Sequence, residues 1–184
     1  MKKALLLAVA LCAGVLCAGT AFGQPTRKAV IHSTPADSKP NSPEVPEVYA
    51  VSTRFERVAI LRLKHKTDLL AGLQKIVREQ KIHNGVFLSA IGSVRSYHVH
   101  AVTNRDFPVE DTFIQDAKGA ADIIGFTGYV IGGKVHAHMT MAAGTKAFGG
   151  HLEPGTEVFT FAVITVGVLP VDVDLSKVDD ITYR

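Results

Sequence analysis

The sequence predicts an α+β fold, in which one main helix packs on a mostly antiparallel mixed sheet of six to seven strands. Two observations support this class. A single segment, at about residues 67–82, has apolar residues at helical spacing. The apolar segments that follow it are separated by short breaks that contain glycine, which are typical of β-hairpins. Neighbouring strands are therefore expected to run antiparallel, with the helix on one face of the sheet.

Residues 1–23 are typical of a secretory signal peptide. Lys2 and Lys3 precede an apolar run over residues 4–18, and Ala21 and Gly23 are the small residues expected at a cleavage site. We therefore expect an exported protein, periplasmic or secreted, with no membrane span after signal cleavage. Both cysteines fall in this segment, so the remaining chain is expected to have no disulfide and no thiolate metal site.

The chain that follows the signal peptide is almost neutral. The sequence has 20 basic and 17 acidic side chains, and removal of Lys2 and Lys3 leaves 18 against 17, a net charge of +1. A nucleic-acid-binding domain usually carries a strongly basic surface. The composition therefore argues against nucleic acid as a partner.

The chain after the signal peptide is expected to have three parts. Residues 24–53 contain five prolines among polar residues and are interpreted as a Pro/Ser-rich linker. Residues 54–170 are expected to form one folded domain, and residues 171–184 an acidic tail. Within the domain, residues 54–64 predict the first strand. Thr67 is the predicted N-cap of an amphipathic helix with this apolar face: Leu69, Leu70, Leu73, Ile76 and Val77.

Two strands are predicted after the helix, over residues 86–91 and 94–102, with a break at Gly92-Ser93. The second strand carries a His-x-His pair, His98 and His100. Because nothing nearby in the sequence completes a set of metal ligands, we interpret this pair as a solvated strand face or an intersubunit surface. Residues 103–119 are expected to form a long surface loop.

A second His-x-His pair, His136 and His138, carries the main chemical signal. These residues alternate with apolar ones and therefore share one face of a predicted strand. Gly144-Thr145 predicts a two-residue hairpin loop, which places His151 opposite His138. Three neutral imidazoles with an open fourth position are typical of zinc sites. The alternatives are a polar patch, or a bulge at Gly149-Gly150 that moves His151 out of register.

Neighbouring polar residues extend this candidate site. A hairpin at Gly132-Gly133 is predicted to place Tyr129 opposite His136 and Thr127 opposite His138. Asp122 and Glu153 are the candidate acid/base residues, although a solvent-facing side chain is the alternative for Glu153. The strand expected over residues 157–169 is apolar on both faces, which indicates a central position or a subunit interface.

Four motifs resemble those of the PPC (plants and prokaryotes conserved) domain family. They are residues 85–93 (GVFLSAIGS), 124–128 (IGFTG), 135–138 (VHAH) and 149–152 (GGHL), and the resemblance covers about residues 55–169. It implies a homotrimer with the histidine motifs near a subunit boundary. Some prokaryotic members are described as metal-containing through the histidines that correspond to His136, His138 and His151.

The family is also associated with DNA, because plant members carry AT-hooks. This sequence has no AT-hook and has a predicted signal peptide, and Asp122 stands where the family pattern has Glu. We therefore expect an exported homotrimer that binds a divalent metal ion through His136, His138 and His151. The three imidazole ligands favour zinc. Metal-assisted activity on a small molecule is left open. A DNA-binding protein and a structural or interaction trimer of the cell envelope are the alternatives.

Overall fold

The computed structural model describes residues 25–35 and 37–184, so the expected signal peptide lies outside the described residues. These residues form one helix, α1 (Leu69–Glu79), and eight strands. The strands are β1 (Thr26–His32), β2 (Arg57–Lys64), β3 (Asn84–Val102), β4 (Val109–Asp116), β5 (Ala121–Ile131), β6 (Lys134–Ala143), β7 (Lys146–Leu152) and β8 (Glu157–Leu169). The described part of the chain contains no helix long and apolar enough to cross a membrane.

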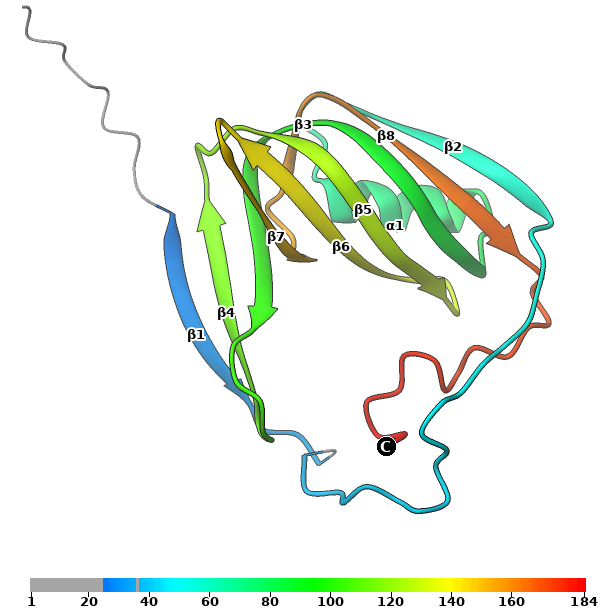
Figure 1. Cartoon of the computed structure of the whole chain (residues 1–184). Coiled ribbons are helices and arrows are strands. Elements are labelled where there is room, and N and C mark those ends of the chain that lie inside the picture. Colours follow the sequence, from blue (N-terminus) through cyan, green and yellow to red (C-terminus); the bar gives the residue numbers. More distant parts are fainter. Residues whose placement is uncertain (1–24, 36) are drawn as a thin grey trace, which may run out of the picture.

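Strand β3 organises the sheet, because it pairs with four other strands. Its first half lies between β8 and β5, and its second half pairs with β4 and β7. The pairings from β3 through β5, β6 and β7 return to β3, where Val99 lies opposite Leu152 and His100 lies opposite His151. In Figure 1, β1 and β4 stand beside the C-terminal half of β3, apart from the arched strands.

The predicted class of one helix on a mostly antiparallel sheet is confirmed, but the predicted number of strands is wrong. Residues 26–32 of the expected linker form β1, and residues 109–116 of the expected loop form β4. These two strands pair with each other along their length, an interaction between distant segments that local sequence patterns do not reveal. The predicted break at Gly92 is also wrong, since β3 continues through it with local shifts of register.

Helix α1 begins one residue later than the predicted cap implies. The side chain of Asp68, and not that of Thr67, accepts a hydrogen bond of 2.8 Å from the backbone N–H of Ala71. The predicted apolar face is confirmed at its centre, where Leu69, Leu73 and Val77 are buried. Burial of side chains of this size stabilises the fold by about 1.5–3 kcal/mol each.

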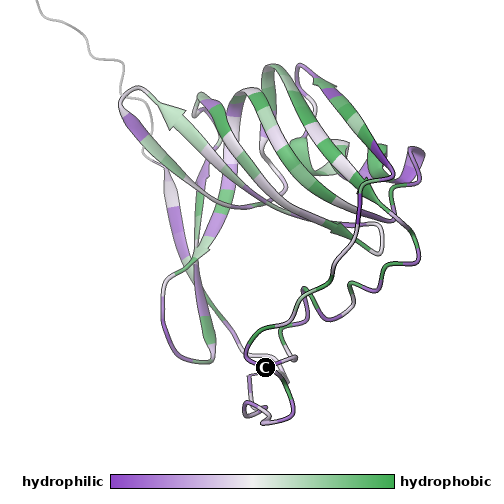
Figure 2. Ribbon diagram, turned by 45° about the vertical axis from the view of Figure 1, so that its right-hand side comes forward, coloured by the Kyte–Doolittle hydropathy of each residue, from purple (hydrophilic) through white to green (hydrophobic). Residues whose placement is uncertain are grey.

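The strands alternate between a buried face and an outer face, which Figure 2 shows as hydrophobic and hydrophilic bands. On β6, Ala137, Met139 and Met141 join the core, while His136 and His138 lie on the outer face. The fold therefore places the histidine motif on the side of the sheet that does not pack against the core.

Candidate metal centre

The two hairpins of the histidine region have the predicted registers. On β6, His138 lies opposite His151 of β7 and opposite Thr127 of β5, and His136 lies opposite Tyr129. One ligand nitrogen from each of His136, His138 and His151 lies within 4.8 Å of the others. His136 Nε2 and His138 Nε2 are 3.3 Å apart. The three histidines predicted from the sequence therefore converge on one point of the outer face.

Gly149 and Gly150 place His151, because they let β7 approach both of its neighbours closely. A Cβ atom at Gly149 would lie 2.0 Å from the carbonyl oxygen of Met139 on β6. A Cβ atom at Gly150 would lie 2.2 Å from the carbonyl oxygen of His100 on β3. The register between β6 and β7 has no shift at these glycines, so the bulge considered as an alternative is absent from this ladder.

Replacement of Gly150 by alanine tests this role. We expect Gly150→Ala to lower the free energy of unfolding by about 1–3 kcal/mol, as overpacking does, because the added methyl group collides with the backbone of β3. Gly125→Ala is the matched control, since its Cβ would lie 3.4 Å from the side chain of Thr140. Urea unfolding of both variants measures the difference. Equal stability of the two variants would contradict the role of Gly150.

The electrostatic environment keeps two of the histidines neutral. Burial, followed by the repulsion of His100 and His136, lowers the pKa of His151 from 6.5 to about 4. Burial and the neighbouring His136 also lower the pKa of His138. A neutral imidazole has a free lone pair on one nitrogen, which is the form that binds a metal ion.

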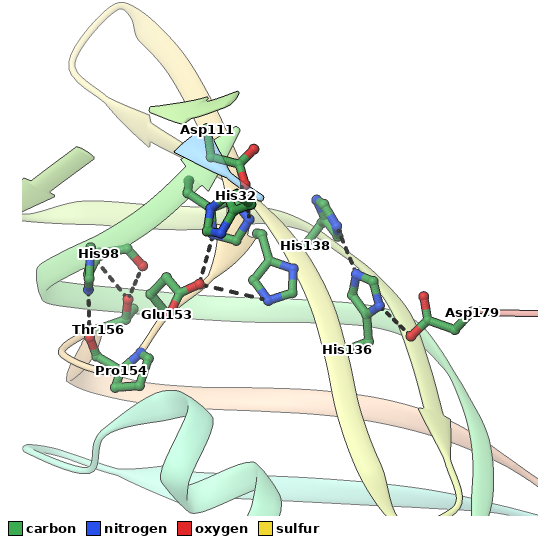
Figure 3. A network of polar contacts seen from close by, with 11 residues as sticks. His32, His98, Asp111, His136, His138, Glu153, Pro154, Thr156 and Asp179 are labelled. Carbon is green, nitrogen blue, oxygen red and sulfur yellow. Dashed lines mark hydrogen bonds and ion pairs between the residues drawn. The ribbon is translucent and has the colours of Figure 1, made fainter. Parts of the chain in front are cut away.

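His136 is held by a carboxylate from the C-terminal tail. Its Nδ1 donates a hydrogen bond of 2.7 Å to Asp179 Oδ2, and Figure 3 shows His136 between His138 and Asp179. With the ring proton on Nδ1, the lone pair of Nε2 faces His138. Metal-binding histidines commonly have a carboxylate on their other nitrogen, which fixes the ring and its tautomer. The predicted acidic tail therefore supplies a residue that orients one of the ligands.

The lowered pKa of His151 predicts that the metal-free protein is less stable in acid. Between about pH 6.5 and 4 the unfolded chain takes up a proton at His151 that the folded chain does not bind. Stability is therefore complete above pH 6.5 and decreases as the pH falls towards 4. Thermal unfolding in the presence of a chelator measures this decrease. We expect a smaller decrease in His151→Gln, and an identical pH profile would contradict the assignment.

His100 belongs to this region, which corrects the expectation that nothing near the His98–His100 pair completes a set of ligands. His100 Nδ1 donates a hydrogen bond of 2.7 Å to Glu153 Oε1, and the rings of His100 and His151 stack with centroids 4.5 Å apart. No local signal predicts this contact, because it depends on the pairing of β3 with β7. His98 instead contacts the backbone oxygen of Pro154, as Figure 3 shows.

The two predicted acid/base residues have different positions. Glu153 lies 2.7 Å from His100 and 4.0 Å from His151 Nε2, at the edge of the histidine cluster. Asp122 lies opposite Ala142, four residues beyond His138 on β6 and therefore about 13 Å along the strand. The geometry of the single chain places Glu153 beside the histidines, and it does not bring Asp122 to them.

A comparison with known families identifies the domain. The model of the Plants and Prokaryotes Conserved (PCC) domain matches residues 50–170. The chain belongs to the PCC domain family. The resemblance stated above on four sequence motifs is thereby confirmed. The matched residues contain every element from β2 to β8, whereas β1 and the tail that carries Asp179 lie outside the PCC domain.

Two curated relatives contain a segment similar to this chain. They are bifunctional proteins GlmU from two Synechococcus strains, JA-3-3Ab and JA-2-3B'a(2-13), with 29% and 27% identity. The alignments cover 70% and 78% of this chain but 20% of each relative. The chain therefore spans about a fifth of the length of the curated relatives that it matches.

Solved structures share the PCC fold. A metal-containing protein from Archaeoglobus fulgidus is 22% identical, with a TM-score of 0.58 over 68% of this chain and 89% of that chain. A plant- and prokaryote-conserved protein from Pyrococcus horikoshii is 21% identical, with a TM-score of 0.56 over 67% and 85% of the two chains. At this level of identity, the comparisons establish the fold alone.

Proposed function

We propose that this PCC-domain protein is exported and binds a divalent metal ion through His136, His138 and His151. The three imidazole ligands favour zinc as this ion. The observation that carries the proposal is the convergence of one nitrogen from each of these three imidazoles within 4.8 Å. Three histidines that leave a fourth position open are the ligand set of several catalytic zinc sites. The similarity to a metal-containing protein from Archaeoglobus fulgidus agrees with this reading.

The residues present fit a metal ion in two further respects. The lowered pKa values of His138 and His151 keep their imidazoles neutral and able to bind near pH 7. The contact with Asp179 holds His136 with its Nε2 lone pair toward the other two rings. These features favour a binding site over a solvated polar patch, in which no common orientation of the rings is needed.

The chemistry available at this site is acid/base and hydrolytic. A bound zinc ion lowers the pKa of a water molecule and polarises carbonyl or phosphoryl oxygens. Glu153, which is partly buried at the edge of the cluster, is placed to accept or donate a proton beside such a group. We propose a small molecule with a carbonyl or phosphoryl oxygen as the substrate class, because these are the groups that a bound metal ion polarises.

Metal analysis of the chain from residue 24, purified without a histidine tag, tests the site. We expect the wild-type protein to retain at least one equivalent of zinc, and His136→Ala/His138→Ala to retain one equivalent less. His83→Ala is the matched control, because His83 is an exposed histidine on the segment between α1 and β3. Equal metal content in the wild-type protein and the double variant would contradict the proposal.

We also propose that the protein assembles as a homotrimer through the apolar part of the outer face. Ile60 lies opposite Thr165 of β8, and Ile91 lies opposite Val163 of β8. Because Thr165, Val163 and Phe161 are spaced two residues apart along β8, Ile60 and Ile91 share a face of the sheet with Phe161. Their exposed fractions are 72% for Ile60, 62% for Ile91 and 37% for Phe161. Exposed apolar patches of this kind mark association surfaces.

This apolar face is continuous with the histidine face. Val86 lies opposite Gly167 on one side and opposite Tyr129 on the other, and Tyr129 in turn lies opposite His136. Residues that are opposite each other in a sheet point to the same side. An association of three chains through the apolar face would therefore bring the histidines close to a subunit boundary.

A charge placed in the apolar face tests the assembly. We expect Ile91→Asp to shift the protein from three chains to one, because burial of an unpaired carboxylate in the interface is costly. Ile31→Asp is the control, since Ile31 is 63% exposed on β1 and lies away from this face. Multi-angle light scattering measures the mass. A wild-type protein of one chain, or a trimeric Ile91→Asp variant, would contradict the assembly.

A further inference from the structure

We propose that His100, His151 and Glu153 form a second divalent-cation site beside the three-histidine site, so that each chain binds two ions. This inference rests on the proposed metal binding at His136, His138 and His151, and it makes Glu153 a metal ligand in place of an acid/base residue. One ligand atom from each of the three residues lies within 4.8 Å of the other two. Two imidazoles and one carboxylate are the ligand set of other catalytic zinc sites and of many iron(II) sites.

The three donors come from neighbouring strands and are partly buried. His100 lies on β3, His151 lies opposite it on β7, and Glu153 follows β7 directly. Their side chains are 20%, 26% and 21% exposed. His100 Nδ1 and Glu153 Oε1 are 2.7 Å apart, and His151 Nε2 lies 4.0 Å from the same oxygen. The dashed lines from Glu153 in Figure 3 mark these two contacts.

A buried carboxylate behind His100 supports a cation at this position. The side chain of Asp111 is 9% exposed, and its Oδ2 lies 3.6 Å from His100 Nε2. Its Oδ1 is buried and has no hydrogen-bond partner among the described residues. His32 Nε2 lies 3.1 Å from Oδ2 but outside hydrogen-bond geometry. A buried carboxylate with so few partners is costly, and a nearby cation offsets that cost.

The arrangement repeats the organisation of the first site. There, Asp179 holds His136 at Nδ1 and leaves Nε2 for the ion. In the second site, an ion at Nδ1 of His100 would displace the proton that Nδ1 donates to Glu153 in the metal-free chain, and the ring would then carry its proton on Nε2, which faces Asp111. Glu153 and Asp111 together supply two negative charges, which match the charge of a divalent cation.

His151 lies between the two sets of donors. Its ring centroid is 4.5 Å from that of His100, 4.8 Å from that of His136 and 5.1 Å from that of His138. Because His151 belongs to both sets, two bound ions would require its ring to bind through both nitrogens as an imidazolate, with the remaining ring proton released to water. The two ions would therefore be neighbours on either side of the His151 ring.

Zinc titration of the metal-free chain from residue 24, monitored by calorimetry and elemental analysis at pH 7.5, tests the proposal. We expect two equivalents in the wild-type protein and in His83→Ala. We expect one equivalent in His100→Ala, in Glu153→Gln and in His136→Ala/His138→Ala. Glu153→Gln preserves the size of the side chain, so it keeps the test valid if His100→Ala does not fold.

The outcomes separate this proposal from the proposed function. One equivalent in the wild-type protein that persists in both His100→Ala and Glu153→Gln would overturn the second site and leave the first intact. One equivalent that disappears in all three variants would also overturn it, since it would indicate a single site shared by the five residues. No zinc in the wild-type protein would overturn both proposals.

Discussion

The close contact of β7 with two strands at once is the constraint on which the rest of the site depends. Gly149 leaves room for the backbone of β6, and Gly150 leaves room for the backbone of β3. Both contacts are needed for the series of paired strands β3, β5, β6 and β7 to close on β3. His151 comes immediately after these glycines, so the closure of the sheet and the position of the central imidazole have one cause.

The imidazoles and the residues around them come from three parts of the chain: the PCC domain, β1 and the C-terminal tail. The PCC domain supplies His100, His136, His138 and His151 from β3, β6 and β7. The flanking segments add His32 from β1 and Asp179 from the tail, which contact Asp111 and His136 respectively. Strands inside the matched PCC domain thus position the histidine cluster, while the carboxylate on His136 comes from a segment outside the matched domain.

Local patterns were sufficient for the part of the site that lies on hairpins. The loops at Gly132-Gly133 and Gly144-Thr145 fix the pairing of β5, β6 and β7, so the approach of His138 to His151 follows from the sequence. The contact of His100 with Glu153 joins residues 53 positions apart and depends on the closure of the sheet. Strands β1 and β4 were missed for the same reason, since their pairing joins distant and largely polar segments.

The two neighbours of β7 differ greatly in their distance along the chain, which matters for how the protein folds. The β6–β7 hairpin closes a very short loop, whereas the contact with β3 closes a long one and carries a larger entropic cost. The hairpin is therefore expected to form early and the contact with β3 late. An ion that binds only after the second step adds its binding free energy to that step. Of the two proposed sites, only that of His100, His151 and Glu153 joins β3 to β7, so an ion bound there would stabilise this long-range contact.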